Sequence, residues 1–572
     1  MKRLFNSLLV LLLLNVPGFA AERPVRIIAM ADKDVLNPVL NPNETAVIYA
    51  KAITSSGKTF DLDPAGLVFA VKNKLASGPD PILELKANRA YPKEGGLATV
   101  SVIATINGQT FYAETDILVR PFYREYHQTL VLKLFMGMEG EPVDRLADQP
   151  LFQKPHDVLC SFADAIELIR KVDHITSGIP KIIYLVGWQE GGHDHQFPSW
   201  EKVNPKLKRK EDATALESLR WLIREARQYH TTVSLHINMA DAYKSSPLWD
   251  EYVKKDIIAR DLQGNLLSSG IQIKGDSMYN VSYTREWAEG LAQRRIDRLV
   301  EMIPELLEGH TIHVDVFVAK TEHQPTLSPW HAKKENGGID IYKEVETQRK
   351  IFKYWRQKGF DVTGEGLFWA HPPGEGFYGL QPMAWWYPAD HSFQLQVPEK
   401  LSARGRTDRQ GDGDFRFGSS MHGEEIFIEN VKTLPGFLQQ FHRTTLIWHY
   451  LSRLDRIALI NDTLFYSNGV KAFKSGSDKL ITQGRVTLRK NNDLFVPAGW
   501  LNKTIIAYSE AGYKGASWQL PADWFDVKKV DLFEIGPAGR RLVGREEVKK
   551  GGVLTLSLSP EQAVAIIPSS DR

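Results

Sequence analysis

Hydrophobic residues follow two different rhythms along the chain, and the rhythm changes near residues 122 and 455. From about 22 to 122, short apolar or alternating runs are separated by turn-forming residues such as Asn41-Pro42-Asn43. Strands of this length, with every second side chain on the same face, predict a β-sandwich. The stretch from about 455 to 572 has the same pattern and predicts a second sandwich.

In the central part of the chain, strand-like runs alternate with helical patterns. The expected strands are 130–135, 182–186, 232–238, 311–319 and 360–367, and the expected helices are 162–172, 213–229, 286–303 and 341–358. Thr214 and Glu217 have the spacing of a capping box, and Gly359 is a C-terminal helix stop. Repeated β/α units of this kind predict a (β/α)8 TIM barrel with insertions. A doubly wound sheet is the alternative, but no glycine-rich phosphate loop follows the first strand.

The first 21 residues have the features of a secretory signal peptide. Met1-Lys2-Arg3 is positively charged, Leu8 to Leu14 is apolar, and small residues follow at 17–21. The apolar run is too short to span a bilayer, and no cysteine follows it for lipid attachment. We therefore expect export to the periplasm or the medium, without a membrane anchor.

The fold class predicted from these patterns is multidomain, α/β plus all-β. The expected parts are a signal peptide over 1–21, an N-terminal β-sandwich over 22–122, a (β/α)8 barrel over 123–454, and a C-terminal β-sandwich over 455–572.

Composition excludes several classes of protein. With 43% hydrophobic residues the chain can bury large cores, so it is not a disordered protein. Cys160 is the single cysteine, which excludes internal disulfides and thiolate metal clusters. The 71 basic and 69 acidic residues nearly cancel, so a nucleic-acid partner is not expected.

Histidine and tryptophan are concentrated in the central region. All 16 histidines lie between His127 and His449, and 11 of the 14 tryptophans lie between Trp188 and Trp448. These side chains supply polar chemistry and flat surfaces for ligands, so the central region is where we expect function.

Three central strands place polar residues on the face opposite the helices. Period-two alternation predicts the following inward positions: Ser234, His236 and Asn238; His313, Asp315 and Phe317; and Thr363 and Glu365. Asp315 and Glu365 lie near the C-terminal ends of neighbouring strands, where barrel enzymes place their chemistry. A buried carboxylate must be paired, hydrogen-bonded or functional, and a structural ion pair is the alternative interpretation. Two carboxylates across a sugar-sized cleft indicate a glycosidase.

The loop over 187–197, with sequence GWQEGGHDHQF, is the other polar cluster. His193 and His195 have the spacing of a metal pair, but without a defined third ligand we expect no metal and no cofactor. Imidazole and carboxylate groups, such as those of His193 and Asp194, also hydrogen-bond sugar hydroxyls, and Trp188 is expected to stack on a sugar face.

These segments resemble the catalytic domain of the endo-α-N-acetylgalactosaminidases, glycoside hydrolase family 101, and of the related family 129. The matching motifs occur in family order: YLVGWQEGGHD at 184–194, HIN at 236–238, HVDV at 313–316 and GE at 364–365. The chain departs from the family pattern at His195-Gln196-Phe197-Pro198, where small residues and a histidine are usual, and at Gly366-Leu367, where an aromatic residue is usual.

The resemblance implies a retaining enzyme that cleaves the α-bond between N-acetylgalactosamine and serine or threonine in mucin-type glycans. It implies that Asp315 is the nucleophile and Glu365 the general acid/base. The other residues expected to contact substrate are Trp188, His193, Asp194, His236, Asn238 and His313.

Several alternatives remain open at this point. Glu322, Glu335 and Glu375 also follow strand ends and are rival acids. A different α-glycoside as substrate, or a glycan-binding protein without catalysis, would fit the same pattern. The expected partner is a carbohydrate or O-glycosylated protein, and the sequence does not determine the oligomeric state.

Overall fold

A computed structural model of the chain describes thirteen segments and divides it into two compact units. The described residues are 23–76, 80–119, 121–126, 129–137, 158–273, 275–317, 326–365, 380–384, 403–404, 434–451, 453–454, 456–461 and 463–569. The units are Met1–Tyr123 with Phe368–Gly379, and Arg124–Leu367 with Leu380–Arg572. The expected signal peptide, Glu322 and Glu375 lie outside the described residues, and the three predicted domain boundaries stay predictions.

The first unit contains two β-sheets that share a core. One sheet has the order β1-β3-β7-β6 with β4 beside β3, and the other has the order β2-β9-β8-β5. The bounds are Pro24–Ala31 (β1), Val35–Leu36 (β2), Ala46–Thr54 (β3), Thr59–Asp61 (β4), Leu67–Ala76 (β5), Leu83–Lys86 (β6), Arg89–Pro92 (β7), Gly96–Ile106 (β8) and Gln109–Val119 (β9). Alternate residues of β3 and β8 are buried, and most of these side chains belong to one hydrophobic cluster, while Ala52 and Ala104 belong to a second.

The second unit contains a parallel sheet whose strand order follows the chain. The strands are Leu130–Phe135 (β10), Lys181–Val186 (β11), Thr231–Asn238 (β12), Thr311–Asp315 (β16), Asp361–Glu365 (β17), Leu380–Ala384 (β18) and Ala403–Arg404 (β19). Each of these strands pairs in parallel with the next. A doubly wound sheet reverses its strand order at a switch point, and the described strands contain no such reversal.

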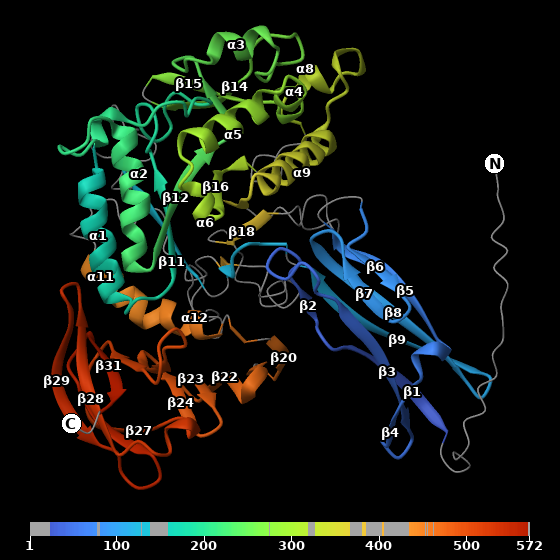
Figure 1. Cartoon of the computed structure of the whole chain (residues 1–572), viewed down its shortest axis with the longest axis vertical. Helices are drawn as coiled ribbons and strands as arrows, with labels where there is room; N and C mark the ends of the chain where they lie inside the picture. Colours follow the sequence, from blue (N-terminus) through green and yellow to red (C-terminus); the bar gives the residue numbers. More distant parts are fainter. Residues whose placement is uncertain are drawn as a thin grey trace. The chain divides into compact units, whose positions relative to one another are not determined.

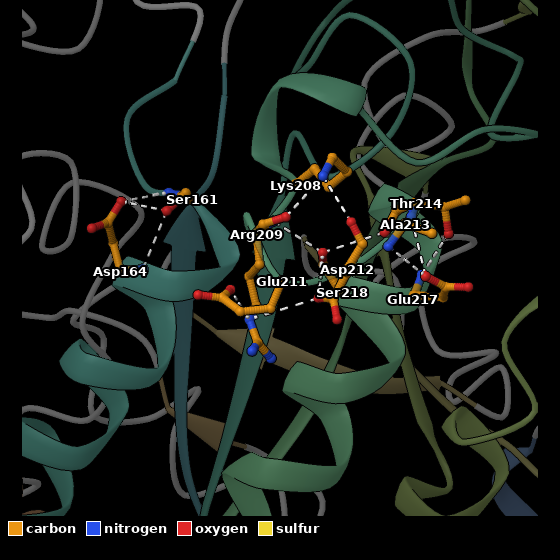
Figure 2. A network of polar contacts seen from close by, with 10 residues as sticks. All are labelled: Ser161, Asp164, Lys208, Arg209, Glu211, Asp212, Ala213, Thr214, Glu217 and Ser218. Carbon is orange, nitrogen blue, oxygen red and sulfur yellow. Dashed lines mark hydrogen bonds and ion pairs between the residues drawn. The ribbon is translucent and has the colours of Figure 1, made fainter.

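Helices fill the crossovers between these strands, as the sequence predicts (Figure 1). They include Phe162–Ile175 (α1), Ala215–Glu225 (α2), Leu291–Met302 (α5) and Ile341–Gln357 (α9). Capping boxes begin α1 and α2, and Figure 2 shows both. In the second, which the sequence predicts, Thr214 Oγ1 accepts from Glu217 N at 3.1 Å, while Glu217 Oε2 accepts from Thr214 N at 3.1 Å.

Two predicted elements are interrupted or shortened because single residues adopt positive φ. The helix expected over 286–303 is divided into Tyr283–Ala288 (α4) and α5, with Gly290 at φ 72° between them. The strand expected over 311–319 ends at Asp315, because Val316 has φ 38° and breaks the alternation. Phe317 therefore does not face inward as predicted. Its ring packs against Tyr283 at 4.3 Å and Phe352 at 5.8 Å.

The C-terminal region is all β in its described part and follows a short helix, Leu446–Leu451 (α12). Its main sheet has the order β20-β21-β22-β23-β24-β25-β26-β31-β28-β29, and β27 pairs with β30. The bounds are Arg456–Ile460 (β20), Thr463–Tyr466 (β21), Val470–Ser475 (β22), Asp478–Gln483 (β23), Val486–Lys490 (β24), Asp493–Pro497 (β25), Ile505–Ser509 (β26), Tyr513–Gln519 (β27), Lys529–Gly536 (β28), Gly539–Glu547 (β29), Val553–Leu558 (β30) and Gln562–Pro568 (β31). Two hydrophobic clusters stabilise this region, one of which includes residues of α12. Among the helices in the described segments, none is long and apolar enough to cross a membrane.

Glu344 on α9 joins that helix to the start of α4. Its carboxylate accepts from Ser282 Oγ at 2.7 Å, from Thr284 N at 2.8 Å and from Thr284 Oγ1 at 3.0 Å. The side chain is only 1% exposed, and this burial raises its pKa from 4.5 to about 7 despite the hydrogen bonds. The carboxyl group of Glu344 is therefore protonated up to a higher pH in the folded protein than in the unfolded chain.

This pKa shift predicts a pH-dependent contribution to stability. Because the folded pKa exceeds the unfolded one, the contribution is fully present below about pH 4.5 and is lost as the pH rises to about 7. The Glu344→Gln variant should lack this dependence, which amounts to at most about 3 kcal/mol in the free energy of unfolding. Calorimetric melting between pH 4.5 and 7.5 tests this, with the exposed Glu346→Gln on the same helix as control. Parallel pH curves for the wild type and Glu344→Gln would contradict it.

Candidate active site

Aromatic rings from neighbouring strands meet at the carboxyl end of the parallel sheet. His313 on β16 lies 5.2 Å from Tyr184 on β11 and 5.2 Å from His236 on β12, measured between ring centroids. His193, in the loop after β11, lies 5.6 Å from His236 and 5.3 Å from Phe135. Three histidines singled out from the sequence therefore share one cluster.

Asp315 ends β16 directly beside this cluster. Its residue partner across the sheet is Asn238, the last residue of β12, and its exposed fraction is 7%. Asn238 Nδ2 lies 3.4 Å from Asp315 Oδ2 and donates to it, and His236 Nε2 lies 3.3 Å from Asp315 Oδ1. The hydrogen bond from Asn238 and the nearby His236 ring fix the direction in which the carboxylate points.

The Asn238 carboxamide is held in turn by Asp241, a residue that the sequence analysis missed. Asn238 Oδ1 accepts from the backbone N–H groups of Ala240 and Asp241 at 2.8 and 2.9 Å. Its Nδ2 donates to Asp241 Oδ2 at 2.8 Å. The amide orientation is thereby set, and a second N–H remains for Asp315. Asp241 begins a short strand, Asp241–Tyr243 (β13), that pairs outside the parallel sheet, so strand periodicity gave no signal for it.

We expect Asp241 to act on catalysis through Asn238. The Asp241→Ala variant removes the acceptor, and a small displacement of Asn238 and Asp315 should lower kcat about 10- to 100-fold. The Asp241→Asn variant retains an acceptor oxygen and should recover most of the loss, which a role that depends on the negative charge of Asp241 would not allow. Steady-state kinetics on an aryl α-glycoside measure both, with the exposed Asp250→Ala as control. Equal losses in the Ala and Asn variants would contradict this role.

The loop carrying His193 and Asp194 is fastened to the end of β10. His193 N donates to Gly137 O at 2.9 Å, and a Cβ atom at Gly187 would collide with that same oxygen. Gly187 has φ 74°, so both its conformation and the close approach require glycine. His193 Nε2 lies 3.4 Å from Asp194 Oδ2, and His193 Nδ1 is buried without a partner in the described segments.

Glu190 organises the remainder of this loop. Its Oε1 accepts from Ser199 Oγ at 2.7 Å, from Glu201 N at 3.1 Å and from Lys202 N at 3.2 Å. Glu190, the first of the two acidic residues in the GWQEGGHD motif, is thus a structural group.

Trp188 lies beneath the histidines and has no exposed surface. Its indole Nε1 donates to His236 O at 3.0 Å. In this position the ring supports the end of β12, which matches a core residue better than the expected sugar-stacking surface.

A buried ion pair between α4 and α5 stabilises the end of β12 and the loop that follows β11. Arg295 on α5 and Glu286 on α4 are 2% and 0% exposed, and Arg295 Nη2 lies 2.5 Å from Glu286 Oε1. Arg295 Nη1 donates to Pro198 O at 2.8 Å and lies 3.5 Å from Asn238 O. The guanidinium therefore connects the loop that follows β11 with the end of β12.

Glu365 is the last residue of β17, and its side chain lies outside the described part of the structure. Val314 of β16 pairs with Gly364 of β17. Asp315 and Glu365 are the next residues on these two parallel strands, so their backbones lie side by side in the same register. The rival Glu335 lies elsewhere, on a surface hollow of about 510 Å³ that Asp256 and Trp330 also line.

The hydroxyls of Tyr126, Tyr184 and Thr311 form a group near the start of β16, before His313 on that strand. Tyr184 and Tyr126 both hydrogen-bond Thr311 Oγ1, at 2.6 and 2.8 Å. Burial raises the pKa of Tyr184 to about 12, so it stays protonated at neutral pH. No group of three or more His, Cys, Asp or Glu side chains is placed to hold a metal ion within the described ranges.

Comparison with known proteins agrees with the motifs. Residues 156–363 match glycoside hydrolase family 101, endo-α-N-acetylgalactosaminidase. The resemblance is confirmed. The match contains the 187–197 loop and Asp315, ends two residues before Glu365, and supports glycosidase activity.

Comparison with solved structures finds matches of low similarity. One is the ligand-free α-N-acetylgalactosaminidase NagBb from Bifidobacterium bifidum, with 11% identity, TM-score 0.40, and coverage of 75% of this chain and 85% of that chain. Another is the α-amylase from Geobacillus thermoleovorans in complex with acarbose, with 12% identity, TM-score 0.38, and coverage of 78% and 100%. No curated protein matches the chain.

Proposed function

We propose that the protein is a retaining glycoside hydrolase that releases α-linked N-acetylgalactosamine from mucin-type O-glycans or glycopeptides. The observation that carries the proposal is the position of Asp315. This carboxylate ends β16, receives a hydrogen bond from Asn238, lies 3.3 Å from His236, and is in register beside the backbone of Glu365.

The mechanism that follows is a double displacement. Asp315 attacks the anomeric carbon while Glu365 protonates the departing glycosidic oxygen, which gives a covalent glycosyl-enzyme and a free alcohol. Glu365, now ionised, takes a proton from water, and the resulting hydroxide displaces Asp315 with net retention of configuration. Adjacent strands are about 4.8 Å apart, which suits the roughly 5–5.5 Å carboxyl separation of retaining enzymes.

The proposed fold of this part is a (β/α)8 barrel. Seven strands in parallel, chain-ordered pairing support it, as do the helices in the crossovers and the polar cluster at the carboxyl ends. Export under the direction of residues 1–21, to the periplasm or the medium, is part of the same proposal, since O-glycoproteins are extracellular substrates.

Two substrates test the proposed activity. The purified protein should release N-acetylgalactosamine from an aryl α-N-acetylgalactosaminide or a disaccharide from a core-1 O-glycopeptide, and NMR should show the α-anomer first. Inactivity on both at high enzyme concentration would reject the substrate assignment. First appearance of the β-anomer would reject the retaining mechanism.

A further inference from the structure

The hydroxyl of Tyr243 is a buried polar group with an unfilled hydrogen-bonding capacity at the edge of the proposed sugar site. The residue is 1% exposed, and its oxygen is buried without a hydrogen-bond partner in the described part of the chain. Buried hydroxyls are nearly always hydrogen-bonded in folded proteins, so an unpaired one beside the proposed nucleophile indicates a position at which a bound molecule is hydrogen-bonded.

The backbone fixes where this side chain lies. Tyr243 and Asp241 are two residues apart on β13 and therefore share one face of the strand. Asp241 uses that face to hold Asn238, which in turn donates to Asp315. Tyr243 N donates to Phe197 O at 2.9 Å, and this ties β13 to the loop that carries Asp194.

The ring of Tyr243 is packed against neighbouring side chains, and its backbone is hydrogen-bonded. It lies 6.3 Å from the Phe197 ring and belongs to a small hydrophobic cluster with Phe197 and Met278. Met278 is also its residue partner on the neighbouring strand, Asp276–Asn280 (β15). A side chain fixed at this many points presents its hydroxyl in one direction without a further loss of entropy on binding.

The charges around the hydroxyl define what can bind to it. Burial raises the pKa of Tyr243 well above 10, and the negative charges of Asp194, Asp241 and Asp315 raise it further. Tyr243 is therefore a permanent proton donor that faces carboxylates, which only accept hydrogen bonds. A group that bridges the two must accept one hydrogen bond and donate another, and a sugar hydroxyl does both.

We infer that Tyr243 is a sugar-binding residue whose hydroxyl donates to a hydroxyl group of the glycone, which in turn donates to one of the neighbouring carboxylates. This inference rests on the proposed glycosidase function and extends it to a residue outside the family motifs quoted above. A buried water molecule in the same place is the alternative occupant.

Kinetics of the Tyr243→Phe variant test the inference. We expect kcat/KM on an aryl α-N-acetylgalactosaminide to fall about 10- to 100-fold, because the site is built to pair a substrate hydroxyl. The melting temperature should stay the same or rise, since the change removes an unpaired buried group. Tyr513→Phe on β27 is the matched control, because this tyrosine is half-buried and its hydroxyl oxygen is also buried; it should leave kcat/KM unaltered.

A panel of monodeoxy aryl α-N-acetylgalactosaminides identifies the contact. For the analogue that lacks the bridging hydroxyl, the loss caused by Tyr243→Phe should shrink to about twofold or less, while the other analogues retain the full loss. An unchanged kcat/KM in Tyr243→Phe overturns the inference in favour of a structural water. An equal loss on every analogue also overturns it.

Failure of the proposed function is distinguishable from failure of this inference. If the wild-type protein turns over no aryl α-glycoside, calorimetric titration with free N-acetylgalactosamine and free galactose tests whether Tyr243 binds a sugar. Binding that weakens about tenfold or more in Tyr243→Phe supports a sugar contact even without catalysis. Equal binding to both proteins, or binding to neither, overturns it.

Discussion

Replacement of Asp315 by asparagine should lower kcat/KM on any active glycoside about a thousandfold or more, with little change in folding. The asparagine side chain fills the same volume and can still pair with Asn238, but its amide is not a nucleophile, so no glycosyl-enzyme forms. Steady-state kinetics, with the melting temperature as a check of folding, measure the effect. Full activity in Asp315→Asn would reject the mechanism.

Chemical rescue distinguishes a nucleophile from a merely supporting carboxylate. In Asp315→Ala, azide should occupy the vacated space and attack the anomeric carbon directly, which gives the β-glycosyl azide from an α-glycoside. Recovery of activity with that product identifies Asp315 as the nucleophile. Azide-dependent formation of the α-azide would assign Asp315 to the acid/base role instead.

Replacement of Glu365 by alanine should have an effect that depends on the leaving group. Glycopeptides require protonation of a poor alkoxide leaving group, and their turnover should fall about a hundredfold to ten-thousandfold. Aryl glycosides with acidic phenols need little protonation, so for these the first step should be nearly unaffected and the glycosyl-enzyme should accumulate. A fall in KM and a burst of released phenol measure this accumulation.

The same variant also decides between Glu365 and its rivals. Azide added to Glu365→Ala should intercept the glycosyl-enzyme and give the α-glycosyl azide, the opposite product to that of Asp315→Ala. Glu335→Gln, on the separate surface hollow, should leave the rate and its leaving-group dependence unchanged. If Glu322→Gln or Glu375→Gln reproduced the leaving-group effect and Glu365→Ala did not, the acid/base assignment would move to that residue.

The sequence predicted the secondary structure well where burial imposed a regular period. The strands around His236 and His313 and the helices α2 and α9 lie within a few residues of their expected bounds. The exceptions have local causes: Gly290 adopts a left-handed conformation inside an otherwise helical pattern, and Val316 turns the chain directly after Asp315. A β-branched residue at positive φ is strained, and no propensity rule anticipates it.

The candidate site was predicted in part, and the missing residues share one property. His193, His236 and His313 were expected at one cleft, and their rings lie within one cluster. Asp241 and Tyr243 were missed because β13, in the long segment between β12 and β16, has only three residues. A strand this short does not show the alternation of polar and apolar residues that reveals which side chains share a face.

What the sequence by itself determined is the side of each strand on which polar groups lie, and hence that Asp315, His236 and Asn238 come together. This follows because a buried face admits only one register, and parallel neighbours align their carboxyl ends. What only the tertiary structure decided is the use of each group: Trp188 as buried support, Glu190 as a loop clamp, Asp241 as the anchor of Asn238. Those roles depend on contacts between segments that lie far apart in the chain or within irregular loops, where chain closure and packing set the partners and no local pattern records them.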